Sequence, residues 1–279
     1  MGTSTHNPGQ SGHTPLVPSW LDDDGNMDFP DGTDGITPDS DDIEPQMPPI
    51  PNNADPDRFR GPRGDFTYYV NSGGRDRSSL RKGVSNYVKR SVGGSANAMK
   101  RVGAGRVSSA RFLSAIGAFA QGGVHEFERF LNLTDIGNRS TSDVLADIAD
   151  NLCPDGGRPD EGAARDAYLN ALEENQDLAN VPFSQLQPDQ LILIYKDTVA
   201  NTIFDRIIND IGNKALFLPE DNYKAEIILR DIKDYIRGAV SDAMARANIS
   251  LSNISASNAQ KTSDSIYRSA FDILEAAGE

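Results

Sequence analysis

Cysteine and histidine are scarce in this sequence, and their scarcity removes several classes of site. Cys153 is the only cysteine, so the chain has no internal disulfide and no cysteine-based zinc site. The three histidines are His6, His13 and His125, and none has a second histidine four residues away on a helix. The sequence therefore predicts no metal site and no cofactor.

Long apolar runs are also lacking. No stretch approaches the roughly 18 continuous apolar residues that a membrane-spanning helix needs. The first residues, MGTSTHNPGQSGH, have neither the basic region nor the apolar region of a secretion signal. We therefore expect a cytoplasmic protein without membrane association, and a single cysteine agrees with a reducing compartment.

Motifs that carry catalysis are missing as well. The glycine-rich stretch GGSANAMKRVGAGR contains neither G-x-x-x-x-G-K-[ST] nor G-x-G-x-x-G, and no G-x-S-x-G marks a serine nucleophile. The aspartate clusters at 22–24 and 39–42 lack the spacing of a calcium-binding loop. We assign no catalytic residue and expect a non-enzymatic protein.

What the chain does have is charge arranged in blocks. Residues 1–57 hold eleven aspartates and one glutamate without any lysine or arginine, which gives a net charge of −12. Residues 58–112 hold thirteen basic and two acidic residues, for +11, and the remainder carries −13. This asymmetry indicates a basic surface that meets an acidic partner or is covered by the protein's own arm.

Residues 1–57 are predicted to form a long disordered acidic arm. They are rich in proline, glycine and aspartate, and bury too little apolar surface to offset backbone ordering, about 1–2 kcal/mol per residue. The stretch TPLVPSWLDDD differs because apolar side chains gather there before three aspartates. It is either a solvated tail with one stray aromatic or a short docking motif, whose candidate residues are Leu16, Val17, Trp20 and Leu21.

A basic, glycine-punctuated helical segment is expected at 58–123. Its cations alternate with Phe59, Phe66, Tyr68 and Tyr69, so the part at 58–112 could bind nucleic-acid phosphates and stack bases. The pI near 4.6 and the adjoining acidic arm instead favour contact with an acidic protein surface or with that arm, and a merely solvated face is the third reading. The candidate basic surface comprises Arg58, Arg60, Arg63, Arg75, Arg77, Arg81, Lys82, Lys89, Arg90, Lys100 and Arg101.

Apolar residues recur with helical spacing along most of the chain, which predicts a mostly α fold with a C-terminal helical domain at 124–279. Phe66 to Val70 alone suggests a short strand or an extended segment. Pro219 is expected in the first turn of the helix that follows it. Helices are expected at 79–92, 95–99, 107–119, 124–133, 141–152, 160–175, 189–215, 220–248 and 265–276.

Several stretches together resemble one family of bacterial defence proteins. They are MGTST, TPLVPSWLDDD, RFRGPR, SGGRDRSSL, GVSNYV, SVGGSANAMKRVGAGR, NDIGNKA and IRGAVSDA, and they run from residue 1 to about residue 245. The chain is similar to the QatB component of bacterial Qat anti-phage defence systems. This resemblance implies a non-enzymatic subunit that binds a QueC-like enzyme, with an ATPase and a TatD-like nuclease of the same system as further partners.

The resemblance also suggests a chemical role for the arm. A QueC-like enzyme activates a carboxylate with ATP and passes it to an amine. Removal of Met1 before the small Gly2 would expose an α-amine with a pKa of about 8, which is partly neutral and nucleophilic. Gly2 is therefore a candidate modified terminus, and an unmodified terminus is the alternative. His6 breaks the myristoylation pattern, so lipidation does not compete.

Overall fold

The first described helix of the chain, α1 (Arg60–Asn71), occupies the place where an extended segment was expected. The expectation was wrong because it followed the strand propensity of aromatic and β-branched residues, which burial overrides. Phe66, Tyr69 and Val70 are all buried, at the i, i+3, i+4 spacing of one helix face. Gly73 and Gly74, both with positive φ, end this segment.

The structure is a computed structural model that describes residues 57–153, 159–212, 218–219, 221–248 and 251–278. All of these belong to one compact unit, residues 45–279. Almost all of the acidic arm, with Gly2 and the Trp20 motif, lies outside the described residues.

The helix α2 (Arg77–Asn86) shows how the sequence sets a helix start. The Asp76 carboxylate accepts hydrogen bonds from the backbone N–H groups of Ser78 and Ser79, which caps the first turn. A π-helical turn, η1 (Tyr87–Ser91), continues the same face. The apolar positions expected on that face are buried, which confirms its periodicity: Leu80, Val84, Tyr87 and Val88.

The mostly α prediction is confirmed. No strand occurs in the described ranges, where Ser140 and Pro182 form only an isolated bridge. None of the described helices is both long and apolar enough for a membrane crossing. The remaining α-helices are α3 (Ser95–Lys100), α4 (Gly103–Leu131), α5 (Thr141–Asp147), α6 (Ala149–Leu152), α7 (Pro159–Glu174), α8 (Pro188–Ile211), α9 (Asn222–Ala247) and α10 (Ala256–Ala276).

Several helices differ from their expected bounds, and the single helix expected at 141–152 is divided at Ile148 into α5 and α6. Three further differences have a visible cause. α4 joins two expected helices across a kink at Gly122 and Gly123, the second of which has φ 64° and ψ −149°. α9 is capped by the Asp221 side chain, so Pro219 precedes the helix and does not lie in its first turn. α10 begins at Ala256, inside the serine-rich stretch, because Ser255 and Asn258 form a capping box.

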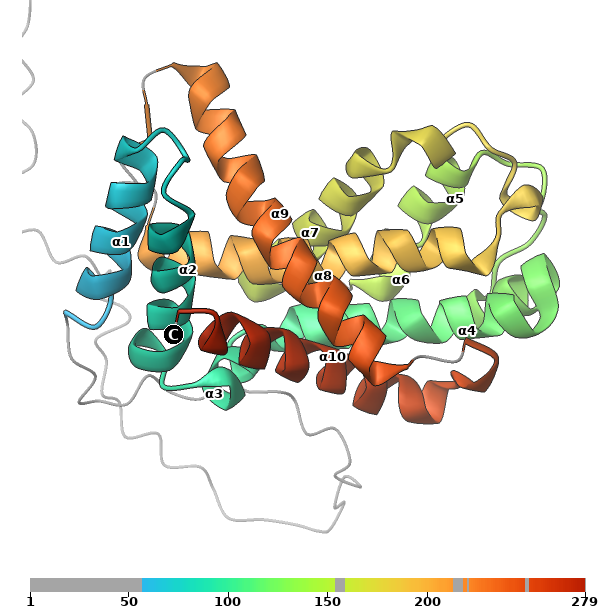
Figure 1. Cartoon of the computed structure of the whole chain (residues 1–279). Helices are drawn as coiled ribbons and strands as arrows, with labels where there is room; N and C mark the ends of the chain where they lie inside the picture. The colour runs from blue at the N-terminus through green and yellow to red at the C-terminus, as the bar shows by residue number, and fades with distance from the viewer. Residues whose placement is uncertain (1–56, 154–158, 213–217, 220, 249–250, 279) are drawn as a thin grey trace, which may run out of the picture. The chain divides into compact units, whose positions relative to one another are not determined.

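The long helices pack around a shared apolar core. α8 contacts α4, α7 and α9, and α10 contacts both α4 and α9 (Figure 1). At one end of α8, α1 and α2 stand side by side, with α3 beneath them (Figure 1). This arrangement places the basic part of the sequence at one end of the described body. The largest buried side chains include Phe66, Tyr87, Phe112, Tyr168, Tyr195, Tyr267 and Phe271.

Candidate functional site

The predicted basic surface divides into cations that hold the fold together and cations that face solvent. All eleven residues lie on α1, α2, η1, α3 or the turns beside them. Arg63 donates from Nε to the carbonyl of Ile211 at 2.9 Å. Arg77 forms an ion pair with Asp231 on α9 at 3.2 Å. These two arginines tie the N-terminal helices to α8 and α9.

Arg101 is the most deeply engaged of the predicted cations. Its Nε and Nη2 donate to the two carboxylate oxygens of Asp210 at 3.0 and 2.9 Å. Asp210 also accepts from the Tyr87 hydroxyl at 2.8 Å and pairs with Arg206 at 3.1 Å. Burial and then the Asp210 charge raise the pKa of Tyr87 well above its ordinary value. The Asp210 cluster is therefore a structural junction between η1, the start of α4 and α8.

Nine of the eleven cations are exposed, and six of these nine have no hydrogen bond or ion pair among the residues that the structure describes. The two acidic residues of the same helices are already engaged, since Asp65 accepts from Asn86 and Asp76 caps α2. This surface therefore keeps a positive charge that the described chain does not neutralise. We call it the free basic surface, and it consists of Arg60, Arg75, Arg81, Lys82, Arg90 and Lys100.

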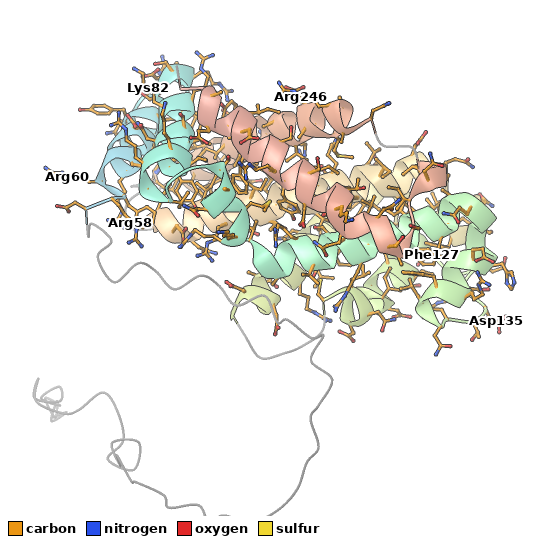
Figure 2. The ribbon with its side chains drawn as sticks, turned by 90° about the horizontal axis from the view of Figure 1, so that it is seen from below. Arg58, Arg60, Lys82, Phe127, Asp135 and Arg246 are labelled. Carbon is orange, nitrogen blue, oxygen red and sulfur yellow. The ribbon has the colours of Figure 1, made fainter. Side chains whose placement is uncertain are left out.

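Figure 2 shows where this surface lies. Arg60 and Lys82 project outward at the same end of the body, together with Arg58, while Phe127 and Asp135 mark the opposite end. Arg58 contacts an aromatic ring, because its guanidinium lies 4.9 Å from the centre of the Phe59 ring, which Arg63 also approaches at 5.8 Å.

The aromatic residues that alternate with these cations are mostly committed to packing. Phe66 and Tyr69 are fully buried, and the Tyr69 hydroxyl donates to Asp231 at 3.3 Å. Phe59 stacks on Tyr87, with 6.3 Å between ring centroids. Tyr68 is 70% exposed, which leaves it as the single open ring of the four that the sequence placed beside the cations. Base stacking would have one platform here.

Other residues singled out in the sequence have ordinary surroundings. His125 is exposed, and burial raises the pKa of the Cys153 thiol, which makes the thiolate rarer. In the described part of the chain, no three histidine, cysteine or acidic side chains gather as metal ligands would. The anchors Asp210, Asp231 and Glu275 were not found from sequence, because they come from helices more than a hundred residues away from their partners.

Comparison with known proteins gives one match. No curated protein and no solved structure matches the chain. A family model described as the Qat anti-phage system associated protein QatB matches residues 93–274. The matched part starts just after η1, so it contains α3 and all later helices except the last residues of α10, while α1 and α2 precede it. Since the match covers more than half of its length, the chain belongs to the QatB family and is a component of a Qat anti-phage defence system.

Proposed function

We propose that this chain is a non-enzymatic binding subunit of the defence system and that its free basic surface contacts an acidic surface of a partner protein. The supporting observation is the set of six exposed, unpaired cations on neighbouring helices of a chain whose net charge is −14. Complementary charge raises association rates and selects partners. The QueC-like enzyme implied by the resemblance is the first candidate partner, and the ATPase and TatD-like nuclease are further candidates.

Nucleic acid is the second candidate ligand for the same surface. Arginine and lysine side chains at this density suit phosphates. Two observations favour a protein instead. The chain's net charge of −14 repels a polyanion at long range, and Tyr68 is the single open ring among the four aromatics interleaved with the cations. A nucleic-acid adaptor would bind DNA or RNA with strong salt dependence, and charge reversal at Arg81, Lys82, Lys89 and Arg90 would weaken that binding.

The arm supplies two further parts of the proposal, both on residues that the structure does not describe. Gly2 is proposed as the amine that the QueC-like enzyme modifies, and the stretch from Leu16 to Leu21 as the docking motif that brings the arm to the enzyme. Intact mass spectrometry of the protein expressed with and without its neighbouring genes tests the first part. An identical intact mass of the protein in both samples would exclude this modification.

Co-purification with the QueC-like enzyme tests the partner-binding role. We expect the wild-type chain to retain the enzyme and a triple variant, R60E/R81E/K82E, to lose most of it, because three repulsive charges replace three attractive ones. The matched control is R246E/K261E, which reverses two exposed, unpaired cations on α9 and α10 outside the free basic surface. Equal retention by all three proteins would exclude this surface as the contact.

A further inference from the structure

A cleft between α4, α7 and α8 is separate from the free basic surface. Its volume is about 240 Å³, enough for roughly eight water molecules. Its lining includes five small residues, and a Cβ added at the buried Gly103 would meet nothing within 4 Å. The cleft therefore exists because side chains there are short: Gly103, Ala104, Gly105, Ala163 and Ala164.

The charged groups of the cleft are compensated with one exception. Arg101 and Arg206 line it and are balanced by Asp160, at 3.3 Å from Arg206, and by the Asp210 behind them. Asp205 also lines the cleft, but it has no hydrogen bond and no ion pair with any described residue. The nearby ammonium of Lys233 pairs with Glu174 at 2.6 Å. Asp205 is thus a carboxylate in a partly buried cleft without a direct ion-pair partner among the described residues, although the charge of Lys233 acts on it from nearby.

The raised pKa of Asp205 agrees with the lack of a direct ion-pair partner. Burial raises its pKa to about 6, the Lys233 charge opposes this shift, and the charges of Asp166 and Glu174 add to it. An unpaired carboxylate in such a place costs free energy, and an N–H-bearing cation would relieve that cost.

The cleft also offers hydrogen-bond donors, which could bind an anionic group of a ligand whose cationic group pairs with Asp205. Asp210 engages Nε and Nη2 of Arg101, and a guanidinium has five N–H donors, so donors remain on a side chain that lines the cleft. Arg101 lies directly before α4, whose start carries no side-chain cap and whose dipole is positive at that end. The cleft therefore offers an acceptor on α8 and donors at the start of α4.

We propose that this cleft binds a free α-amino acid, with its ammonium group on Asp205 and its carboxylate on Arg101. A zwitterion supplies both charges within one small molecule. A simple cation would leave the remaining N–H donors of Arg101 without an acceptor, and a simple anion would be repelled by the Asp205 carboxylate. The α-carbon and the first side-chain atoms of the ligand would lie against the glycine and alanine residues of the lining.

Titration of the full chain with L-alanine, followed by backbone amide NMR, tests this site. A panel of other L-amino acids follows, and ethylammonium and propionate represent the two halves of alanine. We expect saturable shifts of the Ala104 and Gly105 amides with at least one amino acid, and binding at least tenfold weaker for either half. Absence of saturable shifts with the whole panel overturns the proposal, as does equal binding of either half.

Two variants separate a ligand effect from a folding effect. D205N removes the charge of a side chain that holds nothing in the described chain, and A163L fills the cleft from α7. Both should weaken amino-acid binding at least tenfold while the NMR spectrum remains that of a folded chain. D166N is the control, because this exposed acid influences Asp205 but does not line the cleft. Unchanged binding in D205N and A163L contradicts the site.

Discussion

Asp210 is the residue of α8 with the most side-chain contacts to the N-terminal segment. Its side chain is 10% exposed and meets the hydroxyl of Tyr87 and the guanidinium groups of Arg101 and Arg206. Removing one partner of a buried ion pair leaves the other charges unpaired, and this costs more than the pair itself contributes.

We therefore expect D210A to lower the free energy of unfolding by about 3–5 kcal/mol, measured by urea denaturation. The comparison is D160A, which removes a single contact of 3.3 Å at a more exposed carboxylate and should cost about 0–1 kcal/mol. Losses of similar size in the two variants would show that the Asp210 cluster is not a special junction.

Asp205 predicts an unusual dependence of stability on pH. Its pKa in the folded chain is about 6, above the ordinary 3.8, so the folded state keeps this proton over a range where the unfolded state has lost it. The contribution of Asp205 to stability is therefore most favourable below pH 4 and declines as the pH rises through 6. The full change is on the order of 1–3 kcal/mol.

The difference in unfolding free energy between wild type and D205N isolates this effect, because the two proteins differ in this one ionisable group. Between pH 4 and pH 7, D205N should gain stability relative to wild type. Denaturation at several pH values measures it, and a difference that is constant across this range would contradict the raised pKa.

At the scale of elements, the kink of α4 depends on one backbone conformation. Gly123 has φ 64° and ψ −149°, a region that residues with a Cβ avoid. Gly238 on α9 has no such requirement, and a Cβ there would meet nothing within 4 Å.

G123A is expected to lower the free energy of unfolding by about 1–3 kcal/mol because it forces a side chain into that region. G238A should raise the free energy of unfolding by about 0.5–1 kcal/mol, since alanine is more stable than glycine at an exposed position within a helix. Thermal and urea unfolding measure both changes, and stabilisation by G123A would show that the kink is not held by this glycine.

The sequence predicts helices well where their apolar face is regular. Leu80, Val84, Tyr87 and Val88 repeat at helical spacing and are all buried. It fails where local propensity and tertiary burial disagree, as at Phe66 to Val70, and where a cap starts a helix within a polar stretch, as at Ser255. Residue spacing does not show that Arg101 faces inward, because its partner Asp210 is 109 positions away.

The candidate sites differ in how far sequence reveals them. The block of cations at 58–101 is visible in composition, but only the fold divides it into structural arginines and the free basic surface. The cleft at Asp205 leaves no local pattern, because its lining comes from α4, α7 and α8 and depends on which charges find partners.

At the scale of the whole molecule, most of the free basic surface lies outside the residues that the family model matches. The QatB family match begins at Gly93. Five residues of the free basic surface precede it, on α1, α2, η1 and the turn between α1 and α2: Arg60, Arg75, Arg81, Lys82 and Arg90. These helices are nevertheless anchored to the matched part through Asp210 and Asp231. We infer that they present a binding surface that is fixed in position on the family's helical body.

The salt dependence of the affinity for the QueC-like enzyme tests this account most directly. The dissociation constant is measured for wild type, R60E/R81E/K82E and the R246E/K261E control between about 50 and 300 mM salt, a range over which screening becomes strong. We predict that the affinity of the wild type and of the control for the enzyme falls steeply as the salt concentration rises. The triple variant should bind at least about tenfold more weakly at low salt, equivalent to about 1.4 kcal/mol, with a shallow slope. Equal affinity and equal slope for all three proteins would contradict the free basic surface as the binding site.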